Sequence, residues 1–465
     1  MTSKQTTEES ESKELTLEVL QKAVAGSAVA LRCRTKMQPA GGEGTKVFPP
    51  TYAGAVYAME KRRLPGYSEP VDCVLLDSVQ SQANRMEEAL QRAVDEGNLT
   101  LPLVEVDFTP YFPGDDEPEE MRLLYPIGKI SSLQAPHRIA DAILRDSLYK
   151  EKKFRESDIG QMIDRVSYNN ATPLFEICPT ALLFGMWDST GPKGGLGAKF
   201  ERAMVSEIVG VNAVMGVKTS SRIDPLGIQK NAGPLYRRHD DEYTLNPDEA
   251  VDEIIDGKPT GKKLLYKRNK KGQDVFHDPK EEKYPNQGRP SEANLGNVTP
   301  DIDYRRNQNN VLIKDDFGKP IPVGGVTIDY AEQTTVISLP ALRRLHFTEN
   351  NESGGDNAGR TVLAALGLCA ATLANDAGLD LRSRCLLYTK QVPTWTLLDC
   401  NSDDMAFSIK NAISLLKEAV NAAKNKNLEW KTEPINLKPS PGLIQLIVKS
   451  QRLAAKQVGD AEEEE

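Results

Sequence analysis

The sequence predicts an α/β or α+β fold in which helices cover the sheets. Apolar stretches with the two-residue period of strands alternate along the chain with stretches that have the period of helices. Hydrophobic residues make up 39% of the 465 residues, enough to bury a sizeable core. Between Asp240 and about Gly325 this patterning nearly vanishes, which indicates an insertion. The sequence therefore predicts a core in two parts, residues 1–239 and 326–455, separated by an insertion at residues 240–325. An acidic disordered tail is predicted at residues 456–465.

The first predicted elements are a short helix and a basic strand. Apolar residues recur at helical spacing from Leu15 to Val24, and Gly26 stands where the helix would end. The next stretch, AVALRCRTKM, alternates apolar residues with Arg32, Arg34 and Lys36. The three cations either form a basic, functional strand face or are the ordinary exterior of an exposed strand.

A buried strand from Cys73 to Leu76 leads into a helix with an apolar stripe of Met86, Leu90 and Val94. The junction is rich in amides and hydroxyls. Such groups donate hydrogen bonds where the helix N-terminus already favours anions. The candidate contact residues at this junction are Ser78, Gln80, Gln82, Asn84 and Arg85.

Four further elements are predicted before the insertion. Leu101–Phe108 is expected as a strand, and Ser131–Tyr149 as a helix entered through Pro136. The continuous apolar run Thr180–Trp187 predicts a buried strand. A helix is expected from about Ala198, with its buried face made by Phe200, Met204, Ile208 and Val209.

After the insertion the alternation of strands and helices resumes. GVTIDYAEQTTVISL predicts a strand, and an alanine-rich helix follows that ends at Gly378. LRSRCLLY and WTLLDC predict two more strands. DDMAFSIKNAISLLKEAVNAAK predicts a helix with aspartates at its start.

Charge and composition exclude several classes of function. A formal net charge of −9 argues against a protein that coats nucleic acid over a whole face, so a nucleic-acid surface would be a local groove. The six cysteines and four histidines are scattered without ligand spacing, so we expect free thiols, no metal site and no cofactor. The first residues have no apolar signal core and no window spans a bilayer, so we expect a cytoplasmic protein without a membrane partner.

The stretch GMWDSTGPKGGLGAKFER, Gly185 to Arg202, has the composition of a phosphate-binding loop. A Walker A loop requires Ser or Thr after its lysine, but Phe200 follows Lys199. A dinucleotide loop requires glycine at position 200, where the same phenylalanine stands. Loop amides and three cations remain, a set that suits a sugar-phosphate backbone. These cations are Lys193, Lys199 and Arg202.

Two other interpretations of this loop stay open. It could be a glycine-rich connector with solvated lysines instead of a phosphate-binding loop. The chain could also be a nucleotide-binding enzyme that uses the loop Gly191–Lys199.

Several long strings occur together in a characteristic order. They are TKVFPPTYAG, DSVQSQANRMEE, SSLQAPHRIADAILRDS, ALLFGMWDSTGPKGGLGAKFERAMVSEIVG, SRIDPLGI and, later, LRSRCLLY. On these strings the chain resembles the backbone subunit of type I-G (formerly I-U) CRISPR effector complexes, a branch of the RAMP superfamily. The resemblance implies a ferredoxin-like (RRM-type) core with thumb and finger-like insertions.

The resemblance also implies a function and partners. Protomers of such a subunit polymerise head to tail along a guide RNA (crRNA), and each presents guide bases for pairing with target DNA. The implied partners are crRNA, target DNA, copies of the chain and other Cascade subunits, namely a large subunit and a crRNA-processing subunit. No RNP-like aromatic string is present, so contacts are expected from loops and helix starts.

The resemblance places RNA contacts at the candidate residues already named and at others. His137 and Arg138 stand at a predicted helix start, where His137 could instead be a capping or packing residue. Arg222 could equally orient the next turn through Asp224. The full set of candidates is Lys193, Lys199, Arg202, Lys46, Ser78, Gln80, Gln82, Asn84, Arg85, His137, Arg138, Arg222, Arg32 and Arg34.

Catalysis is not expected. Related backbone subunits of type III systems cut RNA with an acidic residue, and Asp188, Asp224 and Asp240 are available carboxylates near basic loops. None of them belongs to a spaced cluster of the kind that two-metal hydrolysis uses. The type I resemblance implies that a separate helicase-nuclease cleaves the target.

Overall fold

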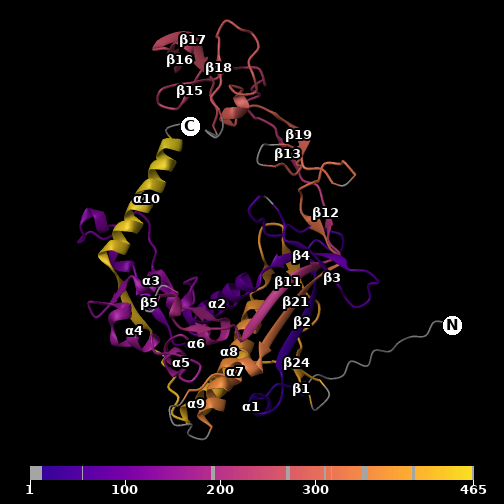
Figure 1. The fold of residues 1–465 in the computed structure, drawn as a ribbon, viewed down its shortest axis with the longest axis vertical. Coiled ribbons are helices and arrows are strands. Elements are labelled where there is room, and N and C mark those ends of the chain that lie inside the picture. Colours follow the sequence, from indigo (N-terminus) through magenta and orange to yellow (C-terminus); the bar gives the residue numbers. More distant parts are fainter. Residues whose placement is uncertain are drawn as a thin grey trace, which may run out of the picture. The chain divides into compact units, whose positions relative to one another are not determined.

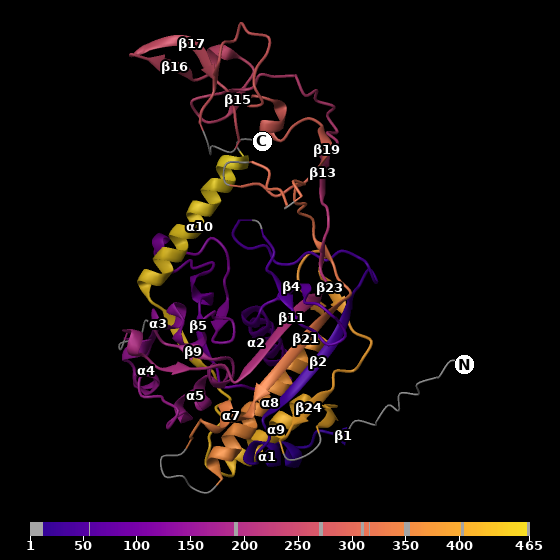
Figure 2. The ribbon, with the colours of Figure 1, turned by 45° about the vertical axis from the view of Figure 1, so that its right-hand side comes forward.

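The computed structural model describes residues 13–54, 56–189, 194–268, 273–307, 311–315, 317–347, 354–400 and 404–462. The chain divides into two compact units. Residues 1–214 and 326–457 form the first unit, and residues 215–325 make up most of the second. Figures 1 and 2 show the elements of each unit from two directions.

A mixed sheet dominates the first unit and confirms the α+β class. Within it, four neighbouring strands have the order β24-β2-β21-β11, and every adjacent pair is antiparallel. Along the chain these strands follow the sequence β2, helix α2, β11, β21, helix α8, β24. This is the 4-1-3-2 order of a ferredoxin-like sheet, and the second unit is inserted between β11 and β21, which are the second and third of these strands along the chain (Figure 1).

The strands of this sheet are, in spatial order, β1 (Lys13–Glu14), β25 (Met405–Ser408), β24 (Trp395–Leu398), β2 (Ala30–Pro39), β21 (Tyr330–Ser338), β11 (Met204–Val211), β4 (Val71–Asp77) and β3 (Met59–Arg62), with β22 (Leu379–Asp380) and β23 (Leu386–Tyr388) beside β2.

Helices α2 (Val79–Asp95) and α8 (Gly355–Asp376) cover the same face of the sheet. Gln82 of α2 accepts a hydrogen bond from Ser206 of β11, and an added Cβ at Gly367 of α8 would meet Met204 of the same strand at 3.0 Å. Met204 and Ser206 project from one side of β11 because alternate residues of a strand share a face. Helices α1 (Leu17–Ala25), α7 (Leu339–Arg343) and α9 (Ala412–Lys424) pack beside α8.

A second, five-stranded sheet completes the first unit. Its order is β6 (Lys129–Ser131), β5 (Val104–Asp107), β26 (Ile435–Pro439), β7 (Ser147–Tyr149) and β8 (Lys152–Lys153). Short strands also pair β9 (Met186–Trp187) with β10 (Lys199–Phe200) and β12 (Val214–Met215) with β20 (Val326–Thr327). The remaining helices are α3 (Ala142–Arg145), α4 (Asp158–Ile163), α5 (Thr172–Ile177), α6 (Pro179–Phe184) and α10 (Pro441–Glu462).

The second unit is built from small strand groups. They are β13 (Thr219–Arg222) with β19 (Val298–Ile302), β14 (Tyr236–Arg237) with β15 (Tyr243–Thr244), and β16 (Asp252–Ile255), β17 (Lys258–Leu264) and β18 (Phe276–His277). A small buried cluster of Tyr236, Ala250 and Leu265 stabilises it. The basic, aromatic stretch around Tyr266 follows β17, and residues 269–272 of that stretch lie outside the described residues.

Three predicted elements are wrong. The run Thr180–Trp187 is largely helix α6, and only its end forms β9, because an apolar run does not by itself distinguish a buried helix from a buried strand. No helix begins at Ala198; β10 and β11 occupy that stretch, with Met204, Ser206 and Ile208 buried on alternate positions. The segment Ser131–Tyr149 is divided among β6, a single 3-10 turn at Arg138–Ala140, α3 and β7.

Two predicted helix boundaries also differ. The stretch that begins DDMAFS forms β25 first, and α9 begins later, with Asn411 as its N-cap. Helix α10 continues to Glu462, past residue 456, where the sequence predicts a disordered tail. Within the described residues, α8 alone is long and apolar enough to cross a bilayer, and 72% of its most apolar window is buried inside the protein.

The carboxylate of Asp77 anchors α2 to the end of β4. It is 1% exposed and accepts hydrogen bonds from Ser81 Oγ (2.8 Å), Gln82 Nε2 (2.7 Å) and Arg85 Nε (3.0 Å) of α2. Arg382 forms an ion pair at 3.3 Å with Oδ1, the carboxylate oxygen that Ser81 also binds, while Gln82 and Arg85 bind Oδ2. Four donors on one buried carboxylate fix both the start of α2 and the loop after β22.

We expect Asp77→Ala to lower the free energy of unfolding by about 3 kcal/mol, because two guanidinium groups and two polar side chains lose their shared acceptor. Urea unfolding followed by circular dichroism measures this. Asp72→Ala is the matched control on the same strand, since its exposed ion pair with Lys61 (3.3 Å) is worth less than about 1 kcal/mol. Equal losses in the two variants would contradict the anchoring role.

Candidate nucleic-acid interface

A groove with a volume of about 1120 Å³ lies in the first unit and collects several of the candidate residues. We call it the α2 groove. Helix α2, the loop before α3, the β9–β10 hairpin and the start of β11 form its walls. Its lining residues are Val79, Gln80, Ala83, Asn84, Pro136, His137, Arg138, Phe184, Gly185, Met186, Trp187, Ser189, Lys199, Phe200, Glu201, Arg202 and Val205. Three strings distant in the sequence therefore meet at one surface.

Helix α2 presents two amides to the groove. Gln80 and Asn84 are both exposed, and their spacing of four residues places them on one helix face. Ser78 is the N-cap of the helix, and its hydroxyl accepts a hydrogen bond from the Ser81 amide. Ser78 therefore shapes the helix start, while Gln80 and Asn84 are available for contacts.

The glycine loop connects two antiparallel strands and does not lead into a helix. Lys199 and Phe200 of β10 pair with Trp187 and Met186 of β9. Gly197 passes so close to the chain that an added Cβ would lie 1.9 Å from the carbonyl oxygen of Asp188. This glycine is thus required by the close approach of the two sides of the hairpin.

An aromatic ring and two cations stand on the hairpin side of the groove. Trp187 is 58% exposed, and Lys199 Nζ lies 5.6 Å from the centre of its ring. Arg202 and Lys199 are exposed, and neither forms an ion pair within the described part of the chain. The neighbouring Glu201 also lines the groove and is paired at 2.8 Å with Arg344, which does not line it.

A buried ion pair forms the wall between α2 and the hairpin. The guanidinium of Arg138 donates to both carboxylate oxygens of Glu87 at 2.6 and 2.7 Å and to the carbonyl oxygen of Gly185 at 3.2 Å. Burial raises the pKa of Glu87 to about 7, against the opposing attraction of Arg138. Arg138 holds three segments of the groove together, and His137 beside it is exposed.

Gln82 and Arg85 lie away from the groove lining. Gln82 is 2% exposed, and its amide binds Asp77, Ser206 and Gln333. Arg85 pairs with Asp77 and donates to the carbonyl oxygen of Leu381 at 2.6 Å. These two side chains attach α2 to the sheet, so we assign them to support of the helix instead of contact with a ligand.

The other candidates are dispersed. Arg32 and Arg34 project from β2, where Arg34 binds Glu332 at 2.7 Å, and Lys46 lies in the loop that follows β2. Arg222 belongs to the second unit and donates to the carbonyl oxygens of Leu295 and Gly296. Lys193 lies outside the described residues. The structure thus brings together Gln80, Asn84, His137, Arg138, Lys199 and Arg202.

The candidate contact residues from the sequence do not include Trp187, because the apolar run Thr180–Trp187 predicts that it is buried in a strand. The available signal was its position at the end of that run, directly before the polar loop, because strand ends next to loops carry exposed side chains.

The carboxylates considered for catalysis have internal partners. Asp188 is buried and binds Arg155 at 2.6 Å. Asp224 accepts hydrogen bonds from the amides of Leu226, Ile228 and Gly296 in the second unit. Asp240 pairs with Arg238 at 2.7 Å. Each of the three has a structural contact of its own.

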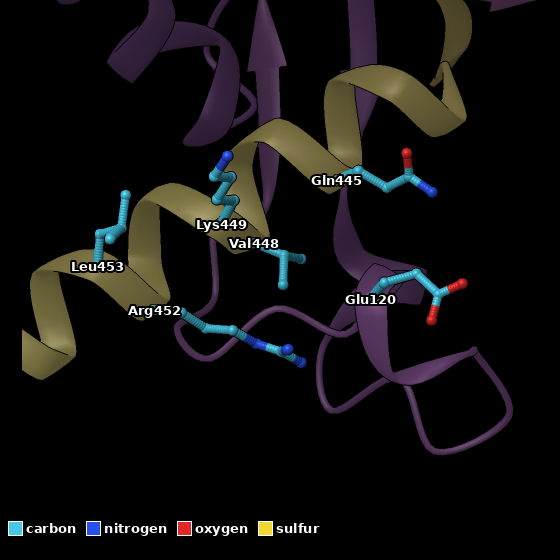
Figure 3. A pocket seen from close by; sticks show the side chains of 6 residues that line it. All are labelled: Glu120, Gln445, Val448, Lys449, Arg452 and Leu453. Atoms are coloured by element: carbon cyan, nitrogen blue, oxygen red, sulfur yellow. The ribbon is translucent and has the colours of Figure 1, made fainter.

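Another hollow, of about 400 Å³, lies beside α10 (Figure 3). One side of it is formed by the helix residues Gln445, Val448, Lys449, Arg452 and Leu453, and Glu120 lines the other side. Arg452 also pairs with Glu119 at 3.2 Å, which ties the helix to this loop. None of the candidate contact residues lines this hollow.

Residues 31–215 match the family model described as CRISPR-associated protein GSU0053. This part of the chain is therefore similar to a CRISPR-associated protein family. It spans β2 to the start of the second unit and contains every lining residue of the α2 groove. No curated protein matches the sequence.

The raised pKa of Glu87 predicts a pH-dependent stability. Glu87 binds a proton more readily in the folded protein, where its pKa is about 7, than in the unfolded chain, where its pKa is 4.5. Between pH 4.5 and about 7, this group's contribution to stability therefore falls as the pH rises, by up to about 3 kcal/mol, and is constant above that range. We expect Glu87→Gln to remove this dependence of the free energy of unfolding on pH, because glutamine does not titrate.

Urea unfolding of wild type and Glu87→Gln at a series of pH values measures the difference, in which the contributions of other groups cancel. Glu88→Gln is the control, because Glu88 is the exposed neighbour on the same helix. A wild-type minus Glu87→Gln difference that does not change between pH 4.5 and 7 would show that Arg138 keeps Glu87 charged throughout.

Proposed function

We propose that the protein is the guide-RNA-binding backbone subunit of a type I CRISPR Cascade complex, and that the α2 groove holds the sugar-phosphate backbone of the crRNA. The observation that carries this proposal is the convergence of an exposed tryptophan, two unpaired cations and two helix amides on one groove. This combination of ring, cations and amides is the chemistry that single-stranded nucleic acid requires.

Each groove residue has a distinct role in the proposal. Lys199 and Arg202 neutralise phosphates, and Arg202 can do so through two parallel hydrogen bonds. The ring of Trp187 stacks on a base or ribose. Gln80 and Asn84 bind phosphate or 2′-hydroxyl oxygens, and His137 adds a donor. Arg138 does not contact RNA in this scheme but positions the wall from which His137 projects.

The acidic character of the chain is compatible with this role. The net charge is −9, but Glu201, the acidic neighbour in the groove, is paired with Arg344. Among the described residues, Lys199 and Arg202 have no such partner, so the cations of the groove are available for phosphates while the net negative charge disfavours non-specific binding.

The larger assembly is part of the same proposal. Copies of the chain would polymerise head to tail along the crRNA, present its bases to target DNA, and contact the large and crRNA-processing subunits of Cascade in the cytoplasm. Support comes from the ferredoxin-like strand order and from the match to a CRISPR-associated family. Cleavage of the target would belong to another protein, and the chain itself would catalyse no reaction.

The test is RNA binding by a groove variant in which Trp187, Lys199 and Arg202 are changed to alanine. Purified wild type should carry RNA in a large assembly, seen in the 260/280 nm absorbance ratio and the elution volume, and the variant should elute as RNA-free protomers. In a binding titration, losing two phosphate contacts should reduce the slope of log K against log salt by about 1.4. Losing the stacking ring should weaken binding about tenfold further.

The matched control changes Tyr125, Lys410 and Arg165, which are exposed and do not line the groove, to alanine. It should behave as wild type. The proposal fails if wild type stays an RNA-free monomer after addition of guide RNA, or if both triple variants bind RNA equally. A rise in melting temperature with ATP or NAD but not with RNA would instead support a nucleotide-binding enzyme.

A further inference from the structure

A third hollow, of about 330 Å³, lies on the central sheet and shares no lining residue with the α2 groove. We call it the tyrosine pocket. It is formed by strands β2, β21 and β23 and by the loops that follow β2 and β23. Its lining residues are Lys36, Met37, Gln38, Glu43, Tyr330, Tyr388, Lys390 and Gln391.

The strand register places both tyrosines beside Gln38 on one face of the sheet. Gln38 of β2 lies directly opposite Tyr388 of β23. On the other side of β2, Met37 is opposite Ala331 of β21. Because these two strands are antiparallel, the next residues along them, Gln38 and Tyr330, are also neighbours. Directly opposed residues of paired strands project to the same side. This is the face away from α2 and α8, because Leu31, Cys33 and Thr35 of β2 point into the core.

The pocket combines aromatic rings with two lysines, Lys36 and Lys390, and one carboxylate, Glu43. Tyr388 is 39% exposed, and Lys36 Nζ lies 4.4 Å from the centre of the Tyr330 ring. Neither Lys36 nor Lys390 takes part in an ion pair of the described residues. By contrast, the next cation along the strand, Arg34, is paired with Glu332. The pocket is therefore the part of this face where cations remain available.

The wall of the pocket contains an unmet hydrogen-bond acceptor. Gln38 donates from Nε2 to the carbonyl oxygen of Asp329 at 3.1 Å, which fixes the orientation of the amide. Its Oε1 atom is buried without a partner in the described structure. An N–H donor of a bound molecule would satisfy this oxygen if the neighbouring side chains rotate to expose it.

We propose that the tyrosine pocket binds one nucleotide of a single-stranded nucleic acid. The base stacks on Tyr388 and Tyr330, and the phosphate binds Lys36 and Lys390. Gln38 and Glu43 accept hydrogen bonds from N–H groups of the base. This site is separate from the α2 groove and does not rest on the function proposed there.

Photo-crosslinking with four-nucleotide oligomers that carry one 5-iodouracil tests the proposal, with the modified peptides identified by mass spectrometry. RNA and DNA oligomers of the same sequence are compared on the full chain and on the Lys199→Ala/Arg202→Ala variant. We expect adducts on Tyr388 or Tyr330 in both proteins. Adducts from RNA only, from DNA only or from both identify which sugar the pocket accepts, and each supports the site.

The variant Tyr388→Leu/Lys390→Ala should require about tenfold more oligomer for tyrosine-pocket adducts, while adducts at Trp187 stay unchanged. Tyr125→Leu/Lys410→Ala is the matched control and should alter neither. If the double variant does not fold, the exposed charge reversal Lys390→Glu replaces it and should have the same effect.

Absence of adducts on both tyrosines at concentrations that label Trp187 would overturn the proposal. An unchanged concentration dependence in the folded variant would overturn it as well, and would leave a protein segment as the more suitable occupant. Labelling of the tyrosines without labelling of Trp187 would support this pocket and count against the α2 groove, so the two failures are distinguishable.

Discussion

One buried carboxylate, Asp77, determines where α2 lies. It ends β4, and its oxygens receive Ser81, Gln82 and Arg85 of the helix together with Arg382 of a distant loop. A buried carboxylate without such partners would strongly destabilise the fold, so the four donors have to lie around Asp77. Gln82 extends the network to Ser206 on β11 and Gln333 on β21. The inner side of α2 is thereby fixed to the sheet, and its outer side becomes a rigid wall of the groove.

The opposite wall is held by a similar device. Arg138 has a positive φ of 52° and joins Glu87 of α2 to the carbonyl of Gly185 before β9. The hairpin that follows needs Gly197 for its close approach and Asp188, paired with Arg155, at its base. Buried ion pairs thus set the width of the groove, while the exposed Trp187, Lys199 and Arg202 remain unpaired on its surface. Residues that support the groove and residues proposed to contact a ligand are thus neighbours in the sequence, but the first are buried and the second are exposed.

The sequence was sufficient to predict the α+β class, the helices α2 and α8 and the strands β2 and β4, because their periodicity is long and regular. It also identified the strings that form the groove. It was insufficient for α6 and β11, where apolar residues fit either period. Gln82 could not be separated from Gln80 by sequence, because its partners Ser206 and Gln333 lie 124 and 251 residues away. Trp187 was hidden in an apolar run for the same reason: exposure depends on distant segments.

The ends of the second unit meet closely. The Gly216 amide donates to the carbonyl of Gly325 at 2.9 Å, and a Cβ on Gly324 would overlap the backbone of Val217. Because the inserted segment begins and ends at neighbouring points of the β11–β21 pair, the sheet places almost no geometric demand on the length or structure of the insertion. Over evolutionary time, the inserted sequence can therefore lengthen, shorten or be exchanged while the register of β11 and β21 is conserved. Divergence among relatives should accordingly concentrate in this excursion, and two small residues at its neck should be the part that selection preserves.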